Sequence, residues 1–170
     1  MADATRGAAV LNDCKYGVSV NDGVIGLSLL RAPVYPDPEA DQGHHQFVYA
    51  YRPWNGPLET SGVQEAADAL NDPLIAVPGV CEPLRILEVD CPSVVVESVK
   101  LAEDGSGDMI LRLFESMGGS RKTLCRPRLP FASACLCSLA EENGEPLPVT
   151  DHAFSLSFRP FEIVTVRLSK

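Results

Sequence analysis

Three acidic residues and two adjacent histidines are the side chains of this sequence whose types could hold a metal ion. Asp37, Glu39 and Asp41 lie at alternate positions, and His44 and His45 follow them in the stretch PVYPDPEADQGHHQF. Carboxylate oxygens and imidazole nitrogens are ligands that zinc prefers. The alternative is a polar loop between two strands, because charged runs on loops usually contact only water.

The spacing of these residues argues against a metal site. Adjacent histidines of an extended chain point to opposite faces, and histidines on a helix need a separation of three or four residues to share an ion. The prolines of the stretch stiffen its backbone, and the calcium pattern D-x-D-x-D-G with a distant Glu is absent. We therefore interpret the stretch as a stiff loop and expect that this chain itself binds no metal or other cofactor.

Nucleophilic and phosphate-binding patterns are also missing from the sequence. It contains no G-x-S-x-G elbow, no Walker loop and no dinucleotide-binding glycine pattern. His152 follows Asp151 near a predicted strand, a position more typical of a surface or capping residue than of a general base. A pair of carboxylates, as in glycosidases, stays open because any two acids can converge in a fold.

Charge and composition limit the partners of the chain. Its 170 residues carry a formal net charge of −9, which argues against nucleic-acid binding, since that needs a surplus of Lys and Arg. No apolar run reaches the ~18 to 20 residues of a membrane span, and the N-terminus lacks a signal-like apolar region. Six cysteines without a C-x-x-C pair predict reduced, mostly buried thiols and a cytoplasmic location.

Short apolar runs separated by turn residues predict an all-β fold with antiparallel strands. In the first half, the runs YGVSV and VIGLSLLRA surround a turn at 21–23, where Asp-Gly accepts the positive φ of a hairpin. The run AAVLND precedes them. In QFVYAYRPW, Phe47, Tyr49 and Tyr51 share one face, which indicates a half-buried strand.

One segment has helical periodicity instead. Apolar residues at i, i+3, i+4 and i+7 from Val63 predict a single short helix near residues 60–71. Ser61 and Gln64 have the spacing of a capping box at its start. The Pro-punctuated residues 74–91 that follow predict a connector with little regular structure.

A domain boundary near residue 90 divides the chain into the expected domains 1–90 and 91–170. Strands are predicted in the second domain at SVVVESVKLAE, DMILRLFES, KTLCRPRLP, SACLCSLAE, AFSLSF and FEIVTVRL, with turns at 105–107, 118–119 and 143–144. A strand spacing of roughly 8 to 12 residues is typical of an antiparallel β-sandwich.

Several stretches, taken in order, resemble the C-terminal region of family 38 α-mannosidases, and most closely the cytosolic, neutral branch. They are AVLNDCKYGVSV, LSLLRAPVYPDPEADQGHHQFVYAYRP, AADALNDPL, VVVESVKLAEDG, LRLFE and FRPFEIVTVRL. The resemblance implies that residues 1–90 are the end of a large β-sandwich and that residues 91–170 form a small terminal β-sandwich.

The resemblance further implies retaining hydrolysis of α-mannosides by an enzyme that uses zinc or cobalt. The metal ligands and the nucleophile of this family lie in an N-terminal α/β barrel. The barrel's His-x-Asp pattern is absent here, because Gln46-Phe47 follow His45 and Ala153-Phe154 follow His152. We therefore expect a non-catalytic β region without catalytic residues, whose partner is the N-terminal catalytic part, in cis or in trans.

The stretch LNDCKYG resembles a region that supplies a basic residue to the sugar pocket in related branches of the family. This resemblance places Lys15, together with Asp13, near the rim of a pocket for a mannose-containing oligosaccharide. The alternative is that these two residues are an exposed pair at a strand end, which contributes ~0 to 1 kcal/mol to stability.

Two other functions stay open. A stand-alone carbohydrate-binding or interaction β-sandwich needs an exposed aromatic platform, for which Trp54 is the candidate, although packing on a turn is the more common role of such a residue. A self-sufficient hydrolase needs an acid pair that no motif supports. If earlier strands of the sheet of residues 1–90 lie elsewhere, the isolated chain exposes an edge and an apolar face, and copies can associate into a homo-oligomer.

Overall fold

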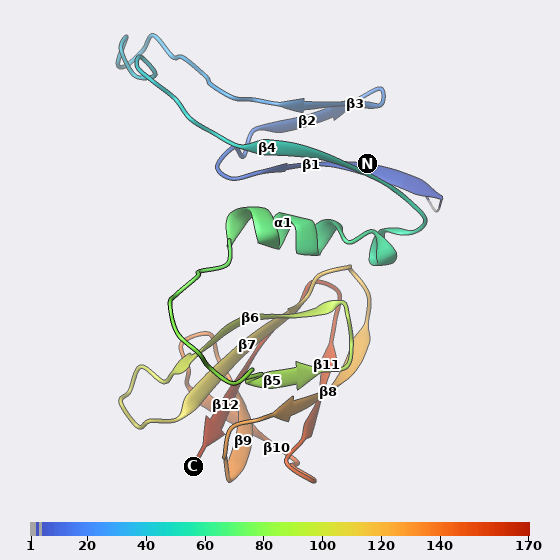
Figure 1. Cartoon of the computed structure of the whole chain (residues 1–170), viewed down its shortest axis with the longest axis vertical. Coiled ribbons are helices and arrows are strands. Elements are labelled where there is room, and N and C mark those ends of the chain that lie inside the picture. Colours follow the sequence, from blue (N-terminus) through green and yellow to red (C-terminus); the bar gives the residue numbers. More distant parts are fainter. Residues whose placement is uncertain (1–2, 4) are drawn as a thin grey trace. The chain divides into compact units, whose positions relative to one another are not determined.

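Antiparallel strands make up most of the chain in the computed structural model, which describes residue 3 and residues 5–170 (Figure 1). The chain divides into two units, residues 1–78 and residues 79–170. The predicted all-β fold with one short α-helix is confirmed.

The strands of the first unit form two antiparallel two-stranded ribbons. β1 (Arg6–Asn12) pairs with β4 (Tyr49–Asn55), and β2 (Val18–Asn21) pairs with β3 (Val24–Leu27). The predicted turn between β2 and β3 is confirmed, because both of its central residues, Asp22-Gly23, have positive φ (46° and 79°). This is the backbone conformation that a tight hairpin requires.

The predicted alternation along β4 is present, but the tyrosine face is the open one. Tyr49 and Tyr51 are 58% and 69% exposed, whereas Ala50 and Trp54 on the other face are half-buried. The reason is the position of the helix: Arg52, on the same face as Trp54, donates from Nη2 to the Ser61 carbonyl oxygen just before the helix (3.1 Å).

The helix is shorter than predicted. A 3₁₀ turn, η1 (Leu58–Thr60), precedes α1 (Val63–Asn71). The capping box is wrong, because Gly62 occupies the N-cap in a left-handed conformation and the Gln64 amide donates instead to Asp68 (3.0 Å). The Ser61 hydroxyl nevertheless accepts a hydrogen bond from the Val63 N–H (3.1 Å), so it still contributes to the start of the helix.

The segment predicted as a connector, residues 74–91, contains a short strand that its sequence does not predict. β5 (Leu87–Val89) pairs with β8 (Arg121–Pro127), and Val89 faces Cys125. The division between the two units accordingly lies at Pro78–Gly79, ahead of the expected boundary near residue 90. Three residues between prolines and a charged run are too few for an alternating pattern to be recognised.

The second unit is a β-sandwich of two sheets. One sheet has the order β10-β9-β12-β7-β6 and the other the order β11-β8-β5. The remaining strands are β6 (Val94–Leu101), β7 (Met109–Glu115), β9 (Ser133–Cys137), β10 (Asn143–Leu147), β11 (Phe154–Phe158) and β12 (Ile163–Ser169).

β10 is absent from the predicted strands, because Asn143-Gly144 were assigned to a turn. The turn lies earlier: Ser138 N–H donates to the Glu142 carbonyl oxygen (3.0 Å), and Glu141 takes the positive φ of 65°. An acidic residue carries the left-handed conformation here in place of the glycine that the sequence offers three residues later.

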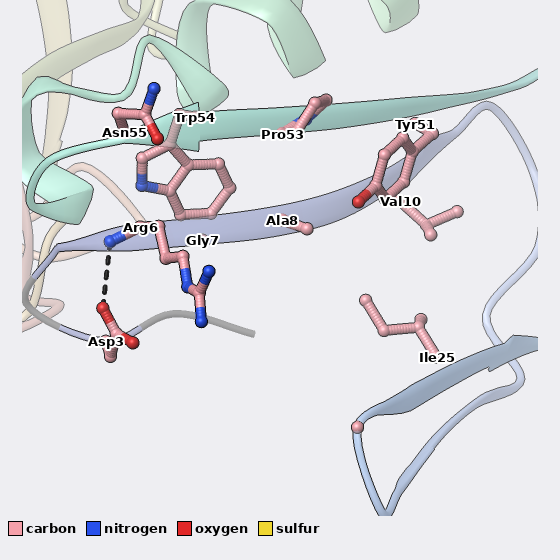
Figure 2. Close-up of a pocket in the computed structure, with 11 residues that line it drawn as sticks. Asp3, Arg6, Gly7, Ala8, Val10, Ile25, Tyr51, Pro53, Trp54 and Asn55 are labelled. Atoms are coloured by element: carbon pink, nitrogen blue, oxygen red, sulfur yellow. Dashed lines mark hydrogen bonds between the residues drawn. The ribbon is translucent and has the colours of Figure 1, made fainter.

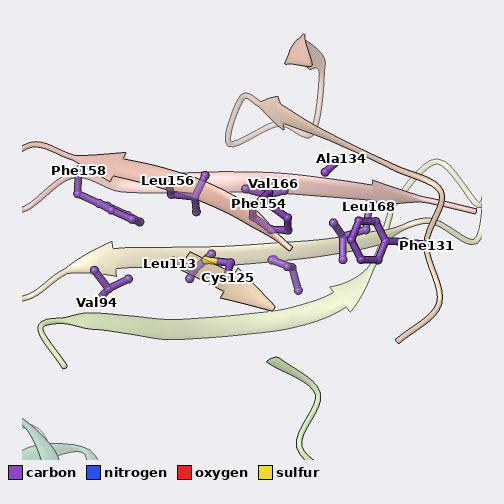
Figure 3. Packing of buried hydrophobic residues seen from close by; sticks show 11 residues of the cluster. Val94, Leu113, Cys125, Phe131, Ala134, Phe154, Leu156, Phe158, Val166 and Leu168 are labelled. Carbon is purple, nitrogen blue, oxygen red and sulfur yellow. The ribbon is translucent and has the colours of Figure 1, made fainter. Parts of the chain in front are cut away.

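Alternating inward side chains of both sheets form the core of the second unit (Figure 3). Phe154, Leu156 and Phe158 of β11 are buried while the serines between them are exposed, and they meet inward residues of β7 and β12 such as Leu113 and Val166. Each such side chain stabilises the fold by about 1.5–3 kcal/mol when fully buried. This core holds the two sheets of the second unit together.

Candidate functional site

Asp13 and Lys15, the predicted substrate-proximal residues, lie in the loop that follows β1. The Asp13 N–H donates to the Val48 carbonyl oxygen (3.2 Å), and the Lys15 N–H donates to Asn12 Oδ1 (2.5 Å). The amide of Asn71, the last residue of α1, donates to the Asn12 carbonyl oxygen (3.3 Å). The loop is thus tied to the start of β4 and to the end of α1.

The ammonium group of Lys15 lies over an aromatic ring. Its Nζ is 4.7 Å from the centroid of the Phe47 ring, which is the geometry of a cation–π interaction. Phe47 precedes β4 and is half-buried, as is Lys15 itself. The contact restricts the long side chain of Lys15 and so holds its charge at one place.

The carboxylate of Asp13 is exposed and ionised at neutral pH. The Cys14 thiol and then the Val48 N–H donate to it, and these hydrogen bonds lower the pKa of Asp13. The same contact with Asp13 raises the pKa of the Cys14 thiol, so this exposed cysteine has little thiolate character. Among the salt bridges of the described residues there is no Asp13–Lys15 pair. The structure therefore does not support the simple strand-end ion pair.

An open groove of about 820 Å³ lies between the β1–β4 ribbon and the β2–β3 hairpin (Figure 2). Val10 and Tyr51 line it from the ribbon and Ile25 from the hairpin, while Asp3 and Arg6 lie at one end. The Asp3 carboxylate is occupied, because it accepts hydrogen bonds from backbone N–H groups, including that of Arg6 (2.9 Å). The groove is mostly apolar, with charge confined to its end.

Trp54 also lines this groove, but its ring is engaged with the strand beside it. Gly7 faces Trp54 across the ladder, and a Cβ on Gly7 would lie 2.1 Å from the indole ring. The indole Nε1 is buried and has no hydrogen-bond acceptor within the described part of the chain. Trp54 packs on a strand rather than on a turn, and Tyr51 is the more exposed aromatic residue of the groove.

The acid and histidine stretch forms a loop whose polar groups hold the loop itself. Asp41 Oδ2 accepts from the Ala32 N–H (2.6 Å), Asp37 Oδ1 accepts from the Glu39 N–H (2.9 Å), and His45 Nε2 lies 2.9 Å from the Asp41 carbonyl oxygen. Among the described residues, His, Cys, Asp and Glu side chains form no group of three that could hold a metal ion. The acids and the histidine of this stretch that make these contacts therefore bind groups of their own loop.

His152 and Cys125 lie in packing positions. His152 contacts the edge of the Phe131 ring, with centroids 6.1 Å apart. Burial raises the pKa of the Cys125 thiol to about 12, so it is an inert core residue. The prediction of mostly buried cysteines is wrong, because Cys14 and Cys81 are exposed and Cys125 is the one that is buried.

A buried carboxylate that the sequence did not single out joins two turns of the second unit. Glu115 has no exposed surface, and it accepts hydrogen bonds from four backbone N–H groups at 2.7–3.2 Å: those of Met117, Gly118, Gly119 and Phe161. Burial raises the pKa of Glu115, but the N–H donors lower it by more, so the net pKa is below its ordinary value. An acidic end to an apolar strand, followed by two glycines, is the signal that could have identified it.

A second unpredicted cluster surrounds Arg167 on the outer face of the larger sheet. Its guanidinium donates to Asp108 (2.7 Å), Asp104 (2.6 Å) and Ser106 (2.8 Å) of the β6–β7 loop. The Arg167 side chain is 9% exposed, and hydrogen bonds from Ser106 and Arg167 lower the pKa of Asp104. In both clusters the charged side chains bind groups of the second unit itself.

Two family models match the chain. The model of the "Glycosyl hydrolases family 38 C-terminal beta sandwich domain" matches residues 93–166, and that of the "Glycosyl hydrolases family 38 C-terminal domain" matches residues 1–39. The first lies within the sandwich of the second unit, and the second covers β1, β2 and β3.

Curated proteins resemble the chain over nearly its whole length. It is 39% identical over 170 residues to Alpha-mannosidase 2C1 of Homo sapiens, 38% identical over 176 residues to Alpha-mannosidase 2C1 of Mus musculus, and 33% identical over 171 residues to Alpha-mannosidase G of Dictyostelium discoideum. These alignments cover 95%, 99% and 95% of this chain, but only 16%, 17% and 16% of the relatives. The chain thus spans about a sixth of the length of the relatives that it matches.

Proposed function

The chain belongs to the C-terminal β region of the family 38 glycosyl hydrolases, and we propose that it is the non-catalytic end of an α-mannosidase. The observation that carries the proposal is the combination of a near-complete match of this chain with a small share of each relative. In this role the two units support an N-terminal catalytic part that acts on mannose-containing oligosaccharides.

The metal chemistry belongs to that catalytic part. Zinc or cobalt would supply a site for sugar hydroxyls there, and the polar groups of this chain that could have been ligands instead hold their own loop. This chain's contribution is structural: the sandwich core holds the second unit, and hydrogen bonds from Asn71 and Asp13 fix the loop with Lys15.

We also propose that Lys15 and Asp13 line the rim of the sugar pocket. The support is that the Lys15 ammonium is held over Phe47 while the ionised Asp13 carboxylate stays exposed beside it. An ammonium and a carboxylate at a pocket rim would donate to and accept from sugar hydroxyls.

A cytoplasmic location completes the proposal, on the resemblance to the cytosolic branch. Within the described residues, no helix has the length and apolar character that crossing a membrane requires.

Two measurements test this function. The purified chain should not hydrolyse an aryl α-mannoside, with or without added zinc or cobalt; turnover above the blank would revive the self-sufficient hydrolase. In an active full-length relative, the counterpart of Lys15→Ala should lower kcat/KM, with Lys122→Ala, an exposed lysine of β8, as the control. An unchanged kcat/KM would remove Lys15 from the pocket.

The alternative of a stand-alone carbohydrate-binding module rests on the groove that Tyr51 lines. It predicts saturable binding of a mannose oligosaccharide to the isolated chain, lost in Tyr51→Ala. The proposed role as an enzyme's C-terminal region predicts no such binding by the chain alone.

A further inference from the structure

The segment between α1 and β5 carries apolar side chains that nothing in the described chain covers. We name residues 74–86 the connector; it contains no helix or strand. Leu74 and Val80 are fully exposed, Ile75 is 89% exposed, and Val77 and Leu84 are 78% and 74% exposed. In Figure 1 it is the green coil that follows α1.

A solvated linker does not explain this composition. Flexible linkers are rich in Gly and Ser or in charge, whereas the connector reads LIAVPGVCEPLRI, with Glu82 and Arg85 as its charged residues. Soluble monomers rarely leave large apolar patches open, and a larger one marks a contact surface. We therefore expect that another protein surface covers the apolar side chains of the connector.

The prolines indicate how it is covered. Pro73, Pro78 and Pro83 recur every five residues, and each lacks the N–H that a β-ladder needs. Edge pairing with the same segment of a second copy is thus interrupted, which is a known protection against aggregation. The side chains stay free, so the partner must offer pockets for Leu, Ile and Val rather than a strand edge.

The relatives of this chain contain a large part that this chain does not match. More than four fifths of each relative lies outside its match with this chain, because the match spans 16–18% of the relative. The match covers at least 95% of this chain in each case, while the two family models end at residue 39 and resume at residue 93. The connector is thus part of the shared sequence but of neither matched domain.

We propose that the connector is a docking segment, whose apolar side chains fill a groove on the N-terminal catalytic part of the same enzyme. This inference rests on the proposed function, since the partner is the part that the function requires. It goes further, because it assigns the contact to particular residues, with Leu74 and Val80 as the side chains that change most on assembly.

A chimera separates the two proposals. The C-terminal 16% of human Alpha-mannosidase 2C1 is replaced by this chain, and Leu74→Ser/Val80→Ser is made in both the chimera and the isolated chain. Leu101→Ser/Leu139→Ser is the matched control, because both of these leucines are 63% exposed in the second unit. The connector pair should leave the Tm of the isolated chain unchanged, yet lower the Tm and the aryl α-mannosidase activity of the chimera; the control pair should change neither protein.

Cys81 supplies a direct readout of docking, because it is an exposed cysteine of the connector. Its alkylation rate should fall at least about tenfold from the isolated chain to the chimera, as a covered segment reacts only when it opens. Two results would overturn docking and leave the proposed function standing. In the first, the chimera is active but Cys81 is alkylated as fast as in the isolated chain. In the second, the chimera is active but Leu74→Ser/Val80→Ser changes neither its Tm nor its activity. An inactive, unfolded chimera counts against the proposed function and overturns the docking segment with it.

Discussion

Replacing Glu115 by glutamine removes one charge from a fully buried hydrogen-bond network. Glu115 Oε2 accepts from Gly118, Gly119 and Phe161, and Oε1 accepts from Met117 (3.1 Å). A glutamine can present its carbonyl oxygen to the first three donors. Its amide NH₂ then faces the Met117 N–H, so one buried donor loses its acceptor and the other three lose a charged one.

The magnitude follows from those losses. A buried donor left without an acceptor costs about 1–3 kcal/mol, and hydrogen bonds to a charged group are worth about 1.5–3 kcal/mol. We expect the free energy of unfolding of the second unit to fall by about 2–3 kcal/mol at pH 7, or roughly 10–20 °C in Tm for a domain of this size.

The pH dependence of the stability difference between wild type and E115Q tests this prediction independently. Although burial raises the pKa of Glu115, the backbone N–H donors bring the folded-state pKa below its ordinary value, which is about 4.3. The stability supplied by a group with a depressed pKa is complete above the unfolded pKa and is lost as the pH falls through the folded one. The difference between wild type and E115Q should therefore be largest at neutral pH and shrink below about pH 4.

Thermal unfolding followed by circular dichroism at several pH values measures both effects. Glu97→Gln, at an exposed glutamate of β6, is the matched control and should be nearly silent. Hydrogen exchange should speed up most at Met117, whose N–H loses its acceptor, and less at Gly118, Gly119 and Phe161, while the fluorescence of Trp54 in the first unit stays unchanged. An E115Q protein within about 0.5 kcal/mol of wild type at pH 7, the usual range of surface substitutions, would refute the reasoning, as would a pH-independent loss.

Three further changes test other parts of the structure. Arg167→Met should lower the Tm and expose the β6–β7 loop to protease cleavage, because Asp104 and Asp108 lose their partner. The control Lys122→Met should change neither the Tm nor the cleavage of the loop. An R167M protein with the Tm and the protease resistance of wild type would show that the cluster is dispensable. Gly7→Ala should destabilise the β1–β4 ribbon by about 1–3 kcal/mol through overpacking against Trp54, seen as a shifted Trp54 emission; an unshifted spectrum with an unchanged Tm would contradict this contact. Cys125 should resist alkylation at pH 8 until the second unit unfolds, since burial raises its pKa to about 12; labelling of the native protein at the rate of Cys81 would count against that burial.

Strong local patterns were sufficient to predict most elements of the fold. The Asp22-Gly23 hairpin, the end of α1 at Asn71 and the alternation of Phe154, Leu156 and Phe158 follow from turn chemistry and periodicity alone. β5 was missed because its pairing with β8, which is remote in sequence, creates it, and β10 was missed because its first residues were assigned to the turn that precedes it. A short strand of this kind is defined by its neighbour more than by its own residues.

The sites were harder to predict than the strands. The spacing of His44 and His45 argued against a metal, and this stays a prediction; the hydrogen bonds of Asp37 and Asp41 within their own loop have no signal in the sequence. The cation–π contact of Lys15 with Phe47 joins residues 32 positions apart, and no local pattern announces it. Periodicity identified the face of Tyr49 and Tyr51 but not its exposure, because the opposite face is the one that contacts the segment before the helix, and that contact is not visible in a local pattern.

Under the proposed function, this chain completes an α-mannosidase without performing its chemistry. Aryl α-mannosidase activity, measured side by side for the isolated chain, for human Alpha-mannosidase 2C1 lacking the matching C-terminal segment, and for the chimera that carries this chain in its place, tests it most directly. We predict turnover by the chimera and none by the isolated chain. Turnover by the isolated chain, or a truncated enzyme that is as active and as stable as the chimera, would contradict the claim.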